Sequence, residues 1–252
     1  MRYALLIAYN GAAYGGWQIQ KNAVSVQEKL TSALEDALGY RVNITASGRT
    51  DSGVHAAAQV CHFDAETTIP PEKIADALNF RLPEDICVLS SVCAPEGFDA
   101  VKSAKKKTYC YRVYLSARRS PLKDGYAVQV NYPVDMARLR KCADMLTGEH
   151  DFKAYCAAGS QVKTTVRTVY SIDIKTSESR GSTDIEFFVT GNGFLYNMVR
   201  TLAGTMLYFA AGRLNEEDIR RSLEEGDRGA VGKTMPAKGL TLETVDYGFK
   251  IF

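Results

Sequence analysis

Apolar and polar residues along the first hundred positions follow the periods of strands and helices. Residues 25–28 read Ser-Val-Gln-Glu, a capping box that opens an amphipathic helix, and Gly39 ends that helix. Pro70 and Pro71 predict the start of a second helix that runs to about Phe80. The predicted order is β-α-β-β-α-β, the split arrangement of ferredoxin-like and RRM-like sheets. The predicted strands of this half are 3–9, 42–46, 57–63 and 86–92.

The second half repeats this order without obvious residue-by-residue similarity. Asp135 caps a helix, a long apolar helix covers about 194–211, and Asn215 opens a shorter one. We therefore predict an α+β protein of two RRM-like or ferredoxin-like halves, residues 1–100 and 101–252, that share a central antiparallel sheet with a cleft between them. The predicted strands of this half are 108–115, 165–174, 184–190 and 240–247.

Composition sets the size of the core and the sign of one surface. The 252 residues are 46% hydrophobic, enough for a substantial core. Lys and Arg total 31 against 29 for Asp and Glu, so the net charge of +2 gives no strong indication of a polyanionic partner. The segment from Val101 to Lys123, however, holds eight basic residues and no acidic residue. The near-neutral total therefore hides a positive patch.

The cysteine pattern and the apolar runs bear on the compartment. Six cysteines are scattered without a Cys-x-x-Cys pair, which indicates neither a zinc cluster nor a disulfide framework. The first residues lack the pattern of a signal peptide, so we expect a cytoplasmic protein. The apolar stretch 187–212 is interrupted by residues 191–193 and carries Asn197 and Arg200, so we expect no membrane span.

The segment from Gly48 to Ala56 is the most informative part of the chain. Gly48 and Gly53 flank a turn that holds Asp51 between two apolar runs, with Arg49 two positions before the carboxylate. Such a turn can bring a carboxylate close to a ligand. The alternative is a capped turn in which Asp51 bonds its own backbone.

Arg200 lies in the middle of the long apolar helix, where a guanidinium needs an anionic partner. Asp51 is a candidate for that partner. The alternatives are that Arg200 extends to the surface or pairs with an unrelated acid.

Cations and tyrosines are mixed along residues 105–114. Lys105, Lys106 and Lys107 precede Tyr109 and Tyr111, which strand alternation places on one face. Aromatic rings stack on bases and cations meet phosphates, so this composition suits RNA. The alternative is an ordinary edge strand protected by lysines.

Taken together, these segments resemble the TruA family, the tRNA pseudouridine synthases. The shared blocks are spread over most of the chain and follow the order of the family. They are residues 48–56, Phe98-Asp99-Ala100 followed by the Tyr109 strand, 147–152, 193–200 and Gly239-Leu240-Thr241-Leu242.

The resemblance implies a role for each candidate residue. Asp51 would be the catalytic carboxylate that isomerises uridine to pseudouridine in the anticodon stem-loop of tRNA, at positions 38 to 40. Arg200 would pair with Asp51, Tyr109 would stack on the target base, and Arg49 would hold the place of the flipped nucleotide. The resemblance also implies a homodimer that binds tRNA. The carboxylate could attack C1′, add to C6 of the base or assist glycal formation, since all three routes use the same group.

The reaction is redox-neutral, so we expect neither a metal nor an organic cofactor. His55, His62 and His150 lack the spacing of a zinc site, and we interpret them as structural. The sequence Gly232-Lys233-Thr234 is not a P-loop, because Asp227 stands where that motif needs glycine.

Two other classes of protein remain as alternatives. A non-catalytic RNA-binding or chaperone module would use similar sheets without chemistry, but binding gives no reason to place a carboxylate where phosphates approach. A glycoside hydrolase usually needs two carboxylates around the scissile bond, and the sequence offers one convincing candidate.

Overall fold

Contacts within the chain divide it into two units. The computed structural model describes residues 1–159, 162–179 and 181–252 of a mixed α+β protein with mostly antiparallel strand pairs. The first unit comprises residues 1–107 and 241–252, and the second comprises 108–240.

The last twelve residues therefore belong with the N-terminal unit, whereas we expected them in the second half. The reason is a long-range contact: the Tyr247 ring packs edge-on against Phe98, and its hydroxyl donates to the Ala100 carbonyl at 3.0 Å. Ala4, Val60 and these three residues form a buried core cluster.

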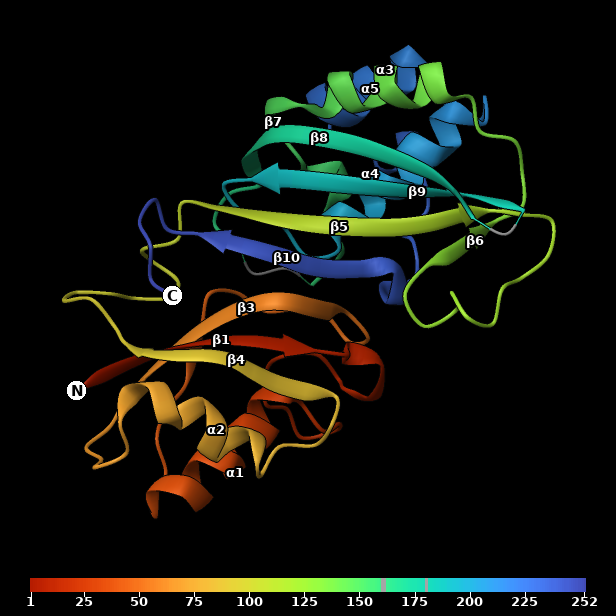
Figure 1. Ribbon diagram of the computed structural model, residues 1–252. Helices are drawn as coiled ribbons and strands as arrows, with labels where there is room; N and C mark the ends of the chain where they lie inside the picture. Colours follow the sequence, from red (N-terminus) through yellow and green to blue (C-terminus); the bar gives the residue numbers. More distant parts are fainter. Residues whose placement is uncertain (160–161, 180) are drawn as a thin grey trace. The chain divides into compact units, whose positions relative to one another are not determined.

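The first unit has the predicted order β-α-β-β-α-β, followed by a C-terminal strand. Its strands hydrogen-bond in the order β4-β1-β3-β10, and β2 pairs with β3. Figure 1 shows both helices on one face of this sheet. The elements are β1 (Arg2–Tyr9), α1 (Val26–Leu38), β2 (Thr45–Ala46), β3 (His55–Asp64), α2 (Ile74–Asn79), β4 (Ile86–Cys93) and β10 (Leu240–Asp246).

Local signals explain the helices of this unit. Ser25 and Glu28 form the predicted capping box, and Gly39 ends α1 with a left-handed φ of 80°. A 3₁₀ turn over Pro71–Lys73 precedes α2, so the regular helix is shorter than predicted. The predicted strand 42–46 is reduced to the two residues of β2.

The second unit departs from the predicted repeat. Its strands hydrogen-bond in the order β5-β9-β8-β7, and β6 pairs in parallel with β5. Strands β6 and β7 have no counterpart in the prediction, and β10, expected here, pairs in parallel with β3 of the first unit. The elements are β5 (Lys106–Leu115), β6 (Val128–Val130), α3 (Met136–Leu146), β7 (Gly148–Asp151), β8 (Val166–Ser179), β9 (Ser182–Gly191), α4 (Met198–Ala210) and α5 (Glu216–Glu224).

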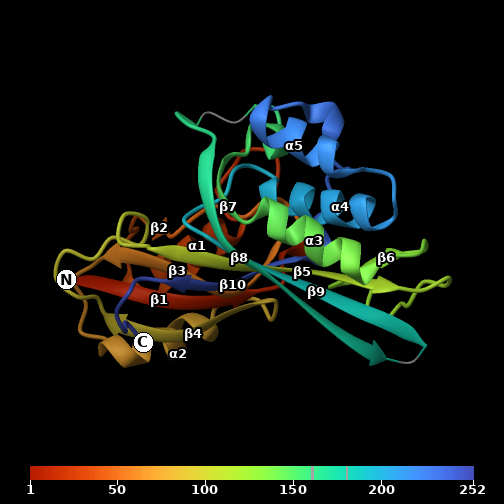
Figure 2. The same cartoon turned by 90° about the horizontal axis from the view of Figure 1, so that it is seen from above.

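Helix α4 is the buried helix of the second unit, as its sequence predicts. Eleven of its residues are buried, and Figure 2 shows it beside α3. The helix begins at Met198 rather than near 194, because Asn197 adopts a left-handed φ of 62°. A residue in the left-handed conformation cannot be part of a right-handed helix, so α4 does not extend to residues before Met198.

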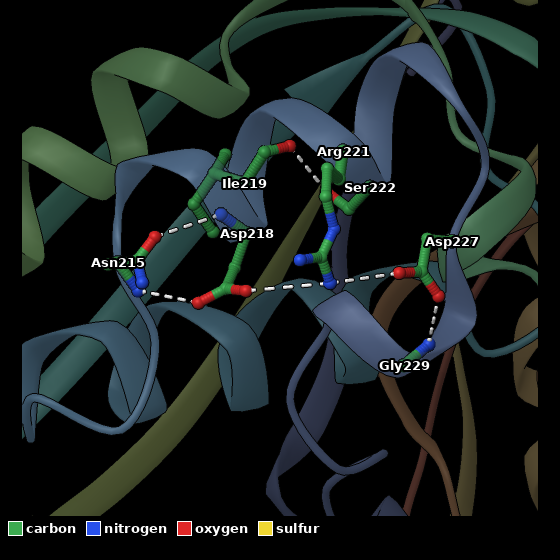
Figure 3. Close-up of polar contacts among 7 residues, drawn as sticks. All are labelled: Asn215, Asp218, Ile219, Arg221, Ser222, Asp227 and Gly229. Carbon is green, nitrogen blue, oxygen red and sulfur yellow. Dashed lines mark hydrogen bonds and ion pairs between the residues drawn. The ribbon is translucent and has the colours of Figure 1, made fainter.

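Helix α5 is fixed at both ends by side chains (Figure 3). Asn215 and Asp218 form a capping box at its start. Near its end, Arg221 Nη2 lies 3.0 Å from Asp227 Oδ2, and Asp227 in turn accepts from the Gly229 backbone at 2.8 Å. These contacts order the 3₁₀ turn Arg228–Ala230, which leads into the segment that packs on α4.

Candidate active site

The turn that carries Asp51 lies between β2 and β3 of the first unit. Val54 N donates to the Asp51 carbonyl at 3.1 Å, which closes the turn, and Gly53 takes a left-handed φ of 77° there. Asp51 is half-buried and Arg49 is exposed. The backbone conformation of the turn is therefore fixed around Asp51, the residue that the sequence indicates.

A second segment, residues 11–17, forms a cradle for this turn. Trp17 N donates to the Thr50 carbonyl at 3.1 Å, and Gly53 N donates to the Tyr14 carbonyl at 3.3 Å. A Cβ on Gly16 would lie 2.5 Å from the Thr50 oxygen and 3.0 Å from the Asp51 carbonyl carbon. The two backbones touch, so a change in the cradle moves the turn.

Tyr9 supports the turn from the core. Its register partner is Ala56 on β3, and its hydroxyl lies 2.8 Å from Thr50 Oγ1. Burial raises the pKa of Tyr9 to about 12. The phenol therefore stays neutral at physiological pH and keeps its hydrogen bond to the residue next to Asp51.

Gln59 and Lys107 hold the beginning of the same loop. Gln59 accepts from Ser47 Oγ at 2.6 Å and donates to the Gly48 carbonyl at 2.9 Å. Lys107 Nζ donates to the Ser47 carbonyl at 2.6 Å, and burial lowers the pKa of this lysine. A Cβ on Gly48 would lie 2.8 Å from Lys107 Nζ. The sequence predicts Lys107 as a substrate-binding cation but does not indicate this bond to the loop.

The other two lysines of the run lie at the surface. Lys106 Nζ is 3.2 Å from Asp246 Oδ2, and Lys105 is exposed. Contact between Lys105, Lys106 or Lys107 and RNA stays a prediction.

Tyr109 lies on β5 in the second unit. Its ring meets the Phe194 ring edge-on, with centroids 5.3 Å apart and planes at 90°. Two positions along the strand, Tyr111 donates its hydroxyl to the Pro236 carbonyl at 2.8 Å, and burial raises its pKa. Tyr109 thus has a fixed ring orientation, which a stacking surface needs.

Arg200 is aimed by contacts at the start of α4. Its Nη1 donates to Asn197 Oδ1 at 2.5 Å, and its Nε donates to the Met235 carbonyl at 2.7 Å. Met235 N returns a bond to the Arg200 carbonyl at 3.3 Å. Among the described residues, Asn197 is the one non-glycine with positive φ. The sequence does not indicate Asn197 or Met235 as supports of Arg200, because the apolar helical pattern runs through residue 197 and residue 235 lies 35 positions after Arg200 along the chain.

The sequence Gly232-Lys233-Thr234 packs on α4, which explains its glycine without any phosphate. A Cβ on Gly232 would lie 2.4 Å from the Gly204 carbonyl oxygen, and a Cβ on Gly204 would lie 1.9 Å from the Lys233 carbonyl oxygen. Gly232 N donates to Thr205 Oγ1 at 2.9 Å, and the Thr201 and Thr234 hydroxyls are 3.0 Å apart. The segment is a polar loop that keeps Met235 against Arg200.

The histidines contact the backbone of neighbouring segments. Gly11 N donates to His55 Nδ1, and Ala100 N donates to His62 Nδ1, both at 3.1 Å. His150 Nε2 lies 3.2 Å from the Thr147 carbonyl. Across residues 1–159, 162–179 and 181–252, no cluster of three His, Cys, Asp or Glu side chains could hold a metal ion.

The expected site residues divide between the units. Asp51, Arg49 and the three lysines belong to the first, and Tyr109 and Arg200 belong to the second. Pairing of Arg200 with Asp51 and stacking of Tyr109 on a base stay predictions. In the part of the chain that is described, no helix is both long and apolar enough to cross a membrane.

Comparison with known proteins identifies the family. The model of the tRNA pseudouridine synthase family matches residues 5–101 and 142–248. The tRNA pseudouridine synthase A of Ruminiclostridium cellulolyticum is 44% identical over 243 residues, 96% of this chain and 98% of that protein. Those of Halalkalibacterium halodurans and Bacillus subtilis are 42% and 41% identical, over 95% and 98% of this chain and 90% and 99% of the relatives.

The chain therefore belongs to the tRNA pseudouridine synthase family, whose members are isomerases that act on tRNA. Its relatives carry the name tRNA pseudouridine synthase A, so the resemblance to TruA is confirmed. A solved Cbf5-Nop10-Gar1 complex matches with a TM-score of 0.36 and 12% identity, covering 91% of this chain and 60% of that one, which is too distant to bear on function.

Proposed function

We propose that this chain isomerises uridine to pseudouridine in the anticodon stem-loop of tRNA, at positions 38 to 40. The observation that carries the proposal is the Asp51 turn in a member of the tRNA pseudouridine synthase family. The backbone of this turn is held by the cradle at residues 11–17 and by Tyr9. A carboxylate on a fixed backbone can be presented to one atom of a bound nucleoside.

The reaction rearranges bonds without any external reagent. The bond from C1′ to N1 of uracil breaks, the base turns, and C5 bonds to C1′. The proton on C5 leaves and N1 gains one, so product and substrate have the same composition. Asp51 supplies the negative charge that this rearrangement needs, either as a nucleophile or as a stabiliser of positive charge at C1′.

Arg200, Tyr109 and Arg49 would serve this step from separate positions. Arg200, aimed by Asn197 and Met235, would pair with Asp51 and keep it ionised. Tyr109 would stack on the uracil, which must stay beside the sugar while detached. Arg49, exposed on the turn, would occupy the gap left by the flipped nucleotide, and Lys105, Lys106 and Lys107 would favour the RNA backbone.

We also propose a role for each of the two units in binding tRNA. Each unit would act as an RRM-like half, and the cleft between them would admit the anticodon arm. The element order of the first unit supports this for that unit. We also propose that two copies of the chain form a homodimer around tRNA, which sedimentation at several protein concentrations tests.

We propose a cytoplasmic location for the enzyme. All six cysteines carry free thiols, and Cys61, Cys110 and Cys142 are buried as small apolar residues. This agrees with a reducing compartment.

The proposed activity is tested on an unmodified tRNA transcript labelled with tritium at C5 of its uridines. Pseudouridine formation releases that tritium, and sequencing of the product maps the modified positions. We expect release from the wild-type protein and pseudouridine at positions 38 to 40. A protein that binds the transcript with strong salt dependence but releases no tritium would instead be the non-catalytic RNA-binding module.

Asn197→Gly tests whether Arg200 must be aimed. Glycine keeps the left-handed backbone of residue 197 but removes the oxygen that accepts from Arg200 Nη1. Because a hydrogen bond to a charged group is lost, we expect single-turnover tritium release to slow roughly tenfold. Asn22→Gly, at an exposed position, is the control and should react like the wild type. Equal rates for both variants would show that the Asn197 contact does not matter to the reaction.

A further inference from the structure

The loop after β5 carries cations that the proposed active site does not use. Residues 116–123 follow the C-terminal end of β5 and line an open cavity of about 710 Å³. Gly181, directly before β9, and Ser182, the first residue of β9, line its other side. Arg118 and Arg119 line this cavity and are exposed. They belong to the acid-free run from Val101 to Lys123.

The loop is ordered by its own contacts. Ser120 N donates to the Tyr114 hydroxyl at 2.9 Å. Lys123 Nζ donates to Ser182 Oγ at 2.8 Å, forms an ion pair with Asp184, and lies 5.6 Å from the centre of the Tyr114 ring. The cavity thus has a fixed wall on the β5 and β9 side.

The acids near the loop are each paired with a lysine. Lys123 pairs with Asp184, and Lys238 pairs with Asp124. The hydrogen bond from Lys238 is the main reason that the pKa of Asp124 is lowered, and the charge of Arg119 adds to it. Among the described residues, neither the Arg118 nor the Arg119 guanidinium forms a hydrogen bond or an ion pair with another side chain. The two arginines therefore give the cavity its net positive charge.

The cavity is far from Tyr109, which lies on the same strand. Tyr109 to Ser116 is seven residues, and a strand rises about 3.3 Å per residue, so the two positions are separated by about 23 Å. A duplex strand rises about 3.4 Å per nucleotide, so this distance corresponds to roughly seven nucleotides, more than the anticodon stem holds beyond the target positions. An RNA that places a base on Tyr109 meets Arg118 and Arg119 with a different part of its backbone.

From this charge and spacing we propose that Arg118 and Arg119 bind a phosphodiester group of the tRNA outside the anticodon arm. The inference rests on the proposed function, because it takes tRNA as the ligand. Guanidinium groups suit it, since their planar donors bind phosphate oxygens in pairs. The site adds affinity and orientation for the whole tRNA and takes no part in the chemistry.

The test compares the double variant Arg118→Ala/Arg119→Ala with the control Arg41→Ala/Arg140→Ala. The control removes the same charge from two exposed arginines elsewhere. Binding to a full-length tRNA transcript and to the isolated anticodon stem-loop is measured over a range of salt, with thermal unfolding to confirm that both variants fold. We expect the loop variant to weaken binding to full-length tRNA roughly tenfold and to lower the salt slope by about one to two, with little change for the stem-loop.

Two results would overturn the proposal. Equal affinities of the loop variant and the control for full-length tRNA would mean that only overall charge matters. An equal loss on the stem-loop and on full-length tRNA would place the contact in the anticodon arm. If the wild-type protein releases no tritium while the arginine dependence remains, the proposed function fails and the binding site stands.

Discussion

Asp51→Asn is expected to lower single-turnover tritium release at least about a thousandfold while tRNA affinity changes less than about threefold. The carboxamide has nearly the same shape as the carboxylate, so the turn held by Trp17 and Gly53 should persist. It lacks the negative charge that each of the three chemical routes requires. The loss should therefore fall on the chemical step and not on binding.

The measurement pairs this variant with Asp36→Asn, which removes a carboxylate from an exposed position on α1. Both are assayed with enzyme in excess over labelled tRNA, and binding is measured separately by filter retention. We expect Asp36→Asn to match the wild type in its rate of tritium release and in its affinity for tRNA. Full activity of Asp51→Asn would assign the chemistry to another residue.

Gly16→Ala is expected to reduce the rate of single-turnover tritium release roughly a hundredfold, although residue 16 is not expected to touch the substrate. The new methyl group would lie 2.5 Å from the Thr50 carbonyl oxygen and 3.0 Å from the Asp51 carbonyl carbon. Real Cβ atoms do not approach backbone so closely, so the turn must shift. A shift of the carboxylate by about 1 Å is enough for a loss of that size.

The matched control is Gly39→Ala, at the glycine that ends α1. Its φ of 80° resembles the 97° of Gly16, but a Cβ there has no atom within 4 Å. Both variants bear the conformational cost of about 1 kcal/mol, and only Gly16→Ala adds the clash. A thermal unfolding measurement first shows that both variants are folded at the assay temperature. Equal activity of the two folded variants would show that the cradle does not set the position of Asp51.

The parts of the fold that the sequence predicts depend on local signals. The capping box at Ser25 and Glu28, the left-handed Gly39 and the buried character of α4 are all present in the structure. Each follows from residues within a few positions of one another. The family also follows from compact motifs, above all the turn around Asp51.

The parts that the sequence misses depend on distant contacts. The C-terminal residues join the first unit because Tyr247 packs with Phe98 and Ala100, which no local pattern shows. Lys107 bonds the Ser47 carbonyl sixty residues away. Helix α4 starts late because Asn197 takes a left-handed conformation, and its side chain bonds Arg200 there. In a sequence, an asparagine at such a position looks like an ordinary helical residue.

A crystal structure of Asp51→Asn bound to full-length tRNA shows whether residue 51 meets the reacting nucleoside. We expect the target uridine to be flipped out of the RNA, the carboxamide of residue 51 to touch its C1′, C2′ or C6 atom, and the Arg200 guanidinium to lie on that carboxamide. A flipped uridine that sits away from residue 51, or an Arg200 paired elsewhere in the complex, would contradict this expectation.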